Sequence, residues 1–135
     1  MTEYGARAGE LFSCGYNCAQ AVACAFAEHF GLPFDSLAAL ACPFGGGVAG
    51  MRNTCGTVSG MIMVIGLAKG NIVPGAKDKK LASYAFAKEA IEEFEALNGS
   101  TVCSELLSMQ KSGEAKKRSC RELCELAADI AAKYL

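Results

Sequence analysis

Four of the eight cysteines in this 135-residue chain stand where a helix is expected to begin. In the first turn of a helix, unpaired N–H groups and the positive end of the helix dipole favour negative charge, so a thiolate there is stabilised. Such thiolates hold metal ions or attack disulfides, and the pattern therefore predicts metal ligation or thiol redox chemistry. Each cysteine follows a residue that can cap a helix: Cys18 after Asn17, Cys55 after Thr54, Cys103 after Ser100 and Thr101, and Cys120 after Ser119.

If the four helix starts converge, their thiolates could bind an iron–sulfur cluster, with a tetrahedral zinc ion as the alternative. Convergence is physically reasonable because helices joined by short loops bring alternate ends together. No C-x-x-C pair occurs, so each ligand would come from a separate helix. That arrangement is typical of a cluster held by a preformed fold. We therefore predict Cys18, Cys55, Cys103 and Cys120 as cofactor-binding residues and metal ligands.

The other four cysteines and the single histidine carry a weaker signal. Cys24 lies within an apolar helix and Cys42 precedes a proline at a helix end, so packing is expected for both. Cys14 and Cys124 each lie within about one helical turn of a predicted ligand and could supply a resolving thiol or a substitute ligand. Packing is the default expectation for this pair as well. His29 follows no C-x-x-C pattern, so no haem attachment is expected.

A glycine-rich segment, residues 44–60, is expected to position the central cysteine. Its first half holds four glycines, which can reach backbone angles closed to other residues, and residues 53–54 are expected to cap the helix that begins at Cys55. Gly56 and Gly60 leave one face of that helix bare, so that a cofactor or another helix can approach the backbone. Neither a P-loop nor a dinucleotide fingerprint is present, which disfavours nucleotide binding.

Apolar residues recur at helical spacing along the chain, and no segment alternates as a half-buried strand does. The sequence therefore predicts an all-α fold in a single domain, residues 1–135. We expect a compact bundle of about five to seven helices with the glycine-rich loop before the central helix. Helices are expected over residues 2–13, 18 to about 31, 35–42, 55–69, 78–97, around 103–107 and over 120–135.

Two of these helices are amphipathic. The helix over residues 78–97 has a lysine- and glutamate-rich outer face, and its expected buried residues are Leu81, Tyr84, Ala87, Ile91 and Phe94. The last helix is expected to bury Leu123, Ala127, Ile130 and Tyr134.

Charge and composition exclude some functions. With 13 basic and 14 acidic residues the net charge is -1, so the chain lacks the basic surface that nucleic acid requires. The longest apolar run, residues 61–68, is too short to insert across a membrane, and no secretory signal is expected from the residues that begin the sequence. A cytoplasmic location is expected, and a reducing compartment disfavours structural disulfides. The expected partner is an unidentified redox protein; a homodimer through helices 18–31 and 55–69 stays open, since core burial explains them equally well.

Several segments resemble the redox-active protein family named for its C_GCAxxG_C_C cysteine pattern, small helical proteins of about this length. Residues 15–22 resemble the first cysteine segment of the family, residues 44–47 and 55–60 its glycine loop and central motif, residues 103–107 its third segment, and Cys120 its last cysteine. The resemblance covers nearly the whole chain. It implies a redox or iron–sulfur role, since a similar domain occurs in split-Soret cytochromes, whose haem-binding motif this chain lacks.

The central motif departs from the family pattern in two ways. Cys55 precedes Gly56 where the family label places glycine first, and Thr57 stands where the label has alanine. The Thr57 hydroxyl could bond back to the helix or to a bound ligand.

Three functions are open at this point. The first is a metal-thiolate redox protein for electron transfer or sensing. The second is a thiol–disulfide or persulfide carrier, in which one low-pKa thiolate attacks and another cysteine resolves. The third is a non-catalytic helical interaction module with inert cysteines.

Overall fold

The computed structural model describes residues 1–113 and 117–135 of the chain. That part of the chain contains seven α-helices and no strand, which confirms the all-α prediction. The helices are α1 (Glu3–Ser13), α2 (Cys18–Cys24), α3 (Phe34–Ala41), α4 (Gly56–Lys69), α5 (Lys77–Asn98), α6 (Cys103–Ser112) and α7 (Cys120–Ala132), with a short 3₁₀ helix, η1 (Cys42–Phe44), after α3.

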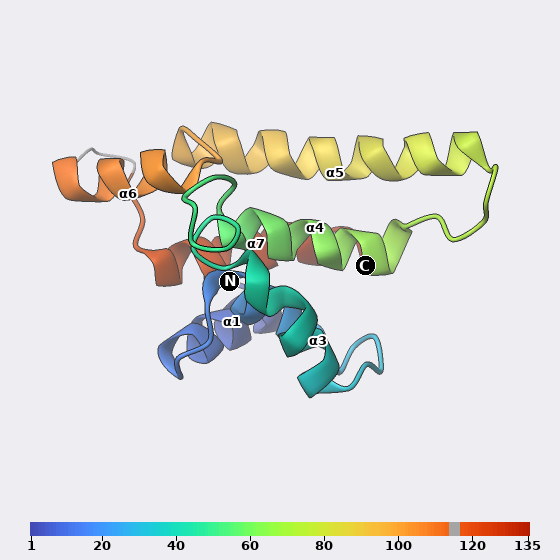
Figure 1. Ribbon diagram of the computed structural model, residues 1–135, viewed down its shortest axis with the longest axis horizontal. Helices are drawn as coiled ribbons and strands as arrows, with labels where there is room; N and C mark the ends of the chain where they lie inside the picture. The colour runs from blue at the N-terminus through green and yellow to red at the C-terminus, as the bar shows by residue number, and fades with distance from the viewer. Residues whose placement is uncertain (114–116) are drawn as a thin grey trace.

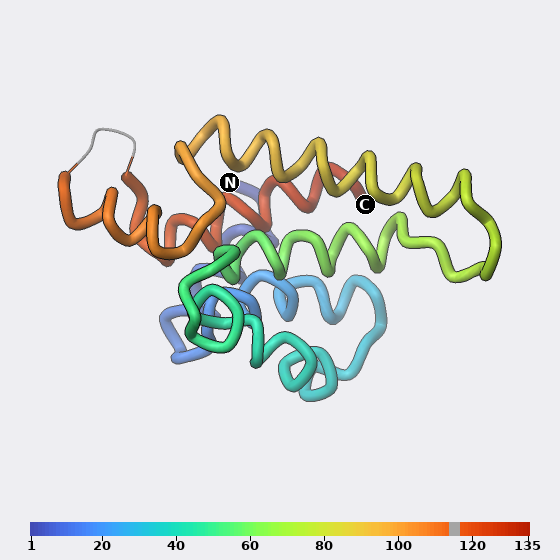
Figure 2. The backbone as a smooth tube through the Cα atoms, turned by 45° about the horizontal axis from the view of Figure 1, so that its top comes forward, coloured from blue at the N-terminus to red at the C-terminus, as the bar shows by residue number. Residues whose placement is uncertain are grey.

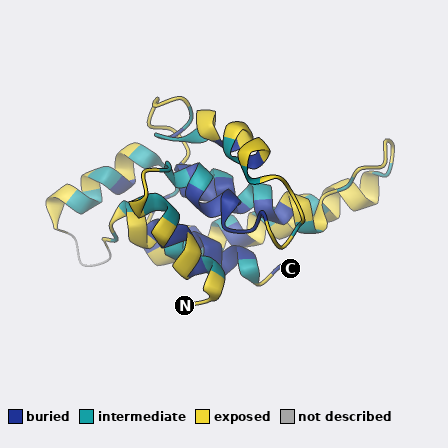
Figure 3. Ribbon diagram, turned by 90° about the horizontal axis from the view of Figure 1, so that it is seen from below, coloured by how far each residue is buried: buried dark blue, intermediate teal, exposed yellow. Residues whose placement is uncertain are grey.

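Helix α4 is the centre of the bundle and packs against α2, α5 and α7 (Figures 1 and 2). Helix α5 forms the outer layer on one side of α4, and α1 and α3 lie on the other side. The buried residues gather at the centre of the molecule (Figure 3). The first and last helices also pack together, and the Thr2 N–H donates to Asp129 Oδ1 at 2.9 Å. In the described residues no helix combines the length and the apolar character that a bilayer span requires.

Two glycines let α2 and α4 touch almost backbone to backbone. A Cβ atom added at Gly60 would lie 2.8 Å from the Ala19 carbonyl oxygen and 2.9 Å from Val22 Cβ. A Cβ atom at Gly56 would lie 3.1 Å from Cys18 Cβ. The bare helix face predicted from these two glycines is therefore used by another helix, and this contact fixes α2 against α4.

Helix α2 is shorter than predicted, since it ends at Cys24 rather than near Gly31. The chain then tightens into turns, in which the Phe26 N–H donates to the Ala23 carbonyl oxygen and the Ala27 N–H to the Cys24 carbonyl oxygen, both at 3.1 Å. These bonds span three residues instead of four, so the α-helix does not continue. The apolar sequence after Cys24 correctly predicted that this segment is buried, but it did not predict the change from α-helix to turns.

The buried face predicted for the long amphipathic helix is partly wrong. Helix α5 buries Ala90 and Phe94, whereas Leu81 and Tyr84 are 49% and 61% exposed. The first turns of α5 extend past the end of α4 in Figure 1, so α4 covers only the later turns of α5. In the last helix, by contrast, all four predicted core residues are buried.

Candidate thiol site

The four predicted cysteines line a single pocket of about 100 Å³. Cys18, Cys103 and Cys120 are the first residues of α2, α6 and α7, and Cys55 directly precedes α4. Four helix starts that are far apart in the sequence therefore meet, as the recurrence of cysteines at helix starts required. The rest of the lining is made by glycines, by leucines and by two polar side chains, namely Gly46, Gly47, Gly56, Leu106, Leu107, Leu123, Arg52 and Gln110.

The cap predicted before Cys18 is confirmed. The Gln20 N–H donates to Asn17 Oδ1 at 3.0 Å, and the Asn17 N–H donates back to Gln20 Oε1 at 3.1 Å. This reciprocal capping box satisfies two N–H groups at the start of α2. Asn17 also donates through Nδ2 to the Cys42 carbonyl oxygen at 2.9 Å, which ties the start of α2 to η1. Cys18 is thus held by local and long-range bonds.

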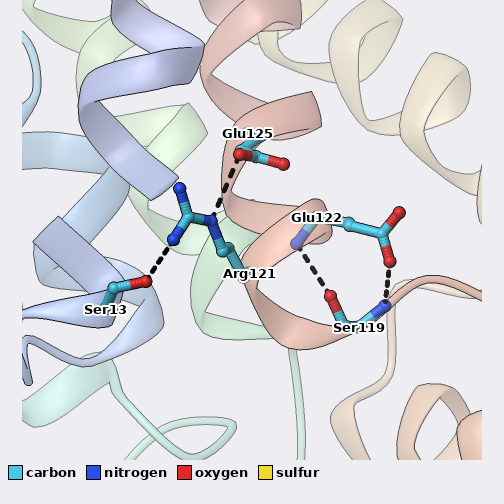
Figure 4. Close-up of polar contacts among 5 residues, drawn as sticks. All are labelled: Ser13, Ser119, Arg121, Glu122 and Glu125. Carbon is cyan, nitrogen blue, oxygen red and sulfur yellow. Dashed lines mark hydrogen bonds and ion pairs between the residues drawn. The ribbon is translucent and has the colours of Figure 1, made fainter. Parts of the chain in front are cut away.

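The cap predicted before Cys120 is confirmed as well (Figure 4). The Glu122 N–H donates to Ser119 Oγ at 3.2 Å, and the Ser119 N–H donates to Glu122 Oε1 at 3.0 Å. The bonds from the Ser119 backbone and hydroxyl lower the pKa of the Glu122 carboxyl group. The next residue, Arg121, donates to Ser13 Oγ, so the start of α7 is also joined to the end of α1.

The caps predicted before the other two cysteines are wrong. Cys55 and Val102 are themselves the N-cap residues of α4 and α6, and neither makes a side-chain capping bond. Residues 53–54 and 100–101 do not cap these helices because Thr54 pairs with Val102 in an antiparallel bridge. Both segments are therefore extended up to the residue where each helix begins.

That bridge joins the two segments that lead into Cys55 and Cys103, with Cys55 opposite Thr101 and Cys103 opposite Asn53. The Cys55 N–H donates to the Thr101 carbonyl oxygen at 2.8 Å, and the Cys103 N–H donates to the Asn53 carbonyl oxygen at 2.6 Å. The two helix starts are therefore joined by backbone hydrogen bonds rather than by their own caps.

The glycine-rich loop closes over Cys103. A Cβ atom at Gly47 would lie 2.7 Å from both Arg52 Cα and Cys103 Cβ, so only glycine fits there. Three non-glycine residues in this loop have left-handed φ angles, 66° at Val48, 51° at Ala49 and 62° at Arg52. Such strain persists where the surrounding structure imposes it and is common at functional sites. Arg52 lines the pocket, and its Nη1 donates to Cys103 Sγ at 3.6 Å.

The thiols of Cys120 and Cys124 lie near the Cys18 thiol and influence its protonation. The Cys120 thiol favours the Cys18 thiolate, but the Cys124 thiol and burial outweigh it and raise the pKa of Cys18 to about 12. For Cys120, the Cys18 thiol and burial raise the pKa, opposed by Gln110 and Arg52. Cys124 thus contacts the site, as its position one turn beyond Cys120 allowed.

Cys55 is 5% exposed and forms a 3.0 Å hydrogen bond with the buried Thr57 hydroxyl. Burial raises the pKa of Cys55, and the Thr57 hydroxyl and the N–H groups of Thr57 and Val58 partly oppose it. The threonine that departs from the family pattern therefore contacts the site cysteine itself.

The sequence argument that a first-turn position stabilises a thiolate is wrong for three of these thiols. Burial and neighbouring thiols raise the pKa values of Cys18, Cys55 and Cys120. A helix dipole contributes about 0.3–1 kcal/mol at an exposed site, which is less than the cost of burying a charge. Without a cation, these three thiols are therefore protonated at neutral pH.

The remaining cysteines lie outside the pocket lining. Cys24 is buried in the core, as predicted, whereas Cys42 is exposed and the packing role predicted for it is wrong. Cys42 ends up on the surface because the chain leaves α3 there and turns into η1. Cys14 is also exposed. His29 is exposed and hydrogen-bonded to the Tyr4 hydroxyl at 3.2 Å.

The donor geometry does not by itself define a metal site. Among the residues that the structure describes, no group of three or more cysteine, histidine or acidic side chains is arranged to hold a single metal ion. The metal-ligand roles of the four pocket cysteines therefore stay a prediction.

A family model described as "Putative redox-active protein (C_GCAxxG_C_C)" matches residues 16–134. No curated protein and no solved structure matches the chain. The matched span includes all four pocket cysteines and the glycine-rich loop that closes over them. The chain therefore belongs to the C_GCAxxG_C_C family, whose description is that of a redox-active protein.

Proposed function

We propose that this protein is a redox protein in which Cys18, Cys55, Cys103 and Cys120 ligate an iron–sulfur cluster for electron transfer or redox sensing. The observation that carries the proposal is the meeting of four thiols, from four separate helix starts, around one pocket. Cysteines retained only for packing have no reason to share a cavity.

The donor set and the size of the pocket fit such a group. Thiolate sulfur is the donor that iron–sulfur clusters take, and also one that zinc accepts. The pocket of about 100 Å³ is several times larger than the ~10–15 Å³ that a single water needs. A lone zinc ion would draw four sulfurs to within about 2.3 Å of itself and leave no such space. The volume therefore favours a group of several atoms, with zinc as the alternative if the pocket contracts.

A bound cluster would supply one-electron chemistry, and the chain would supply its charge balance. Thiols at Cys103 and Cys120 must lose their protons to act as ligands. Arg52 donates to Cys103 Sγ at 3.6 Å, and Gln110 Nε2 donates to Cys120 Sγ at 3.8 Å. These two donors stabilise negative charge on the sulfurs.

One observation favours thiol–disulfide exchange as a second candidate, namely that the Cys18 and Cys120 thiols line the same pocket and each influences the pKa of the other. In that reaction a substrate disulfide would oxidise both thiols to an intramolecular disulfide and leave as two thiols. The raised pKa values of Cys18 and Cys120 make attack slow at neutral pH, so this candidate ranks second.

Anaerobic purification tests the first proposal. We expect visible charge-transfer absorption with stoichiometric iron and sulfide, lost in serine variants of the four pocket cysteines. Cys42→Ser is the matched control, because Cys42 is exposed and outside the pocket, and should keep the cluster. Protein that stays colourless and metal-free after reconstitution would overturn the proposal. If that protein also forms a Cys18–Cys120 disulfide, the exchange reaction would replace it, whereas inert thiols would favour an interaction module.

A further inference from the structure

The outer side of α5 carries more apolar surface than this bundle uses. Leu81 and Tyr84 are 49% and 61% exposed, although both belong to a regular amphipathic helix. No element of the described chain lies above α5 in Figure 1. Most apolar residues of α2 and α4, by contrast, are buried in the core. These helices therefore offer little apolar surface for an interface with a second copy of the chain.

These exposed residues belong to one continuous stripe. At about 100° per residue, eight positions from Lys77 to Glu95 fall within a sector of about 120°, beside the face that Ala90 and Phe94 bury, and the buried Asn98 ends that sector. All of them are exposed except one isoleucine, which is half-buried. We call this set the α5 stripe: Lys77, Lys80, Leu81, Tyr84, Lys88, Ile91, Glu92 and Glu95.

Charge along the α5 stripe runs from basic to acidic. Lys77 and Lys80 stand at the start of α5, and Glu92 and Glu95 stand near its end, where the last turn has no basic residue. A helix dipole favours the opposite order, with acidic residues first and basic residues last. Within α5, Lys88 and Glu92 form an i,i+4 ion pair at 3.9 Å, but the basic start and the acidic end of the stripe oppose the helix dipole.

The stripe is complementary to itself when read in the opposite direction. In an antiparallel pair centred at position 86, Lys77 lies opposite Glu95 of a second copy. Lys80 then lies opposite its Glu92, and the next positions pair Leu81 with Ile91 and Tyr84 with Lys88. The last pair places a cation on an aromatic ring. Every position meets a suitable partner twice, as the symmetry of a two-fold interface requires.

We propose that α5 is the interface of a homodimer in which two copies pair antiparallel along the α5 stripe. The occupant is a second copy of this chain, because an antiparallel copy matches the basic start, apolar middle and acidic end of the stripe at once. Pairing the two helices also sets their dipoles antiparallel, which is favourable. The interface lies outside the thiol pocket and does not depend on the function proposed for that pocket.

The size of the stripe limits the strength of the dimer. It extends over 18 steps of about 1.5 Å, or roughly 27 Å. A helix pair of that length reaches only the lower end of specific interfaces, on the order of 1,000 Å² in total. The charged pairs are at the rim and are screened by salt. We therefore expect micromolar association that weakens as salt is added.

Sedimentation velocity over a range of concentrations tests the proposal with two charge-reversal variants. Lys77→Glu with Lys80→Glu makes both ends of the stripe acidic, and Glu92→Lys with Glu95→Lys makes both ends basic. Each variant alone should be monomeric at concentrations where the natural chain is dimeric. An equimolar mixture should form a heterodimer, because each end again meets the opposite charge.

The matched control, Lys79→Glu with Lys111→Glu, changes the charge equally but lies off the stripe, and should dimerise like the natural chain. Circular dichroism checks that each variant is folded, as expected for exposed positions. The proposal is overturned if the natural chain is monomeric at every concentration, if both reversals leave the dimer intact, or if the mixture does not pair.

Discussion

The same substitution should have opposite effects at two glycines of α4. A Cβ atom at Gly60 would lie 2.8 Å from the Ala19 carbonyl oxygen and 2.9 Å from Val22 Cβ, so either α2 or α4 must shift. A Cβ atom at Gly66 would meet nothing within 4 Å. Gly60→Ala should therefore destabilise the protein relative to Gly66→Ala, although both replace a helical glycine by the best helix former.

The magnitude follows from two terms. Alanine in place of a helical glycine contributes about 0.5–1 kcal/mol of stability, and at Gly66 nothing opposes this gain. Overpacking a close contact costs about 1–3 kcal/mol, and only Gly60→Ala incurs it. Because the helix-propensity term is common to both variants, the difference between their free energies of unfolding gives the overpacking cost directly. We expect Gly66→Ala to be stabilised and Gly60→Ala to be about 1–3 kcal/mol less stable than it.

Urea denaturation followed by circular dichroism measures both free energies, and each 1 kcal/mol should move the melting temperature by about 4 °C. A second readout follows the site, because Ala19 adjoins Cys18. A shift of α2 moves that thiol in the pocket, so Gly60→Ala should change the rate at which Cys18 is alkylated, while Gly66→Ala leaves it unchanged. Equal stability of the two variants would refute the inference that α2 and α4 are held by backbone contact.

Three further predictions concern single side chains. Burial and the 3.0 Å bond to Glu89 raise the pKa of Tyr134 from its ordinary value of 10.0 to about 12, so the stability that this hydroxyl provides is complete below about pH 10 and lost as the pH rises to about 12. Tyr134→Phe should cost about 1 kcal/mol near neutral pH and show a shallower loss of stability above pH 10 in denaturant titrations. Arg52→Gln removes the donor to Cys103 and should lower the reduction potential of a reconstituted cluster by on the order of tens of millivolts, measured by redox titration, with Arg52→Lys nearer the original value. Ser119→Ala removes one partner of the capping box and should cost about 1 kcal/mol in chemical denaturation, largely restored by Ser119→Asp.

Local signals predicted two of the four pocket cysteines in detail. Asn17 and Ser119 cap their helices through bonds to residues three positions later. Because both partners of such a bond lie within four consecutive residues, a short stretch of sequence is enough to predict it. The caps before Cys55 and Cys103 could not be predicted in this way. They are replaced by pairing between segments 48 residues apart, Thr54 and Val102, and no local pattern encodes that pairing.

The buried face of α5 is set by tertiary packing and could not be predicted from the spacing of its apolar residues. Helix α5 has apolar residues on more than one flank, and the sequence alone does not say which flank α4 covers. The pattern placed Leu81 and Tyr84 in the core, whereas the structure leaves both exposed. Similarly, the helix dipole at Cys18 is a local effect, but the burial that raises its pKa depends on the whole fold.

The walls of the thiol pocket differ in how firmly they are held, and this difference bears on how a cofactor could enter. Cys18 and Cys55 stand on helices that touch through Gly56 and that bury much of the core. Cys103 stands on α6, which contributes a single buried residue, Leu106. A helix with so little buried apolar surface opens at lower free energy than the core helices do. The wall of the pocket that can move at least cost is therefore α6, and the cluster proposed above would enter from that side.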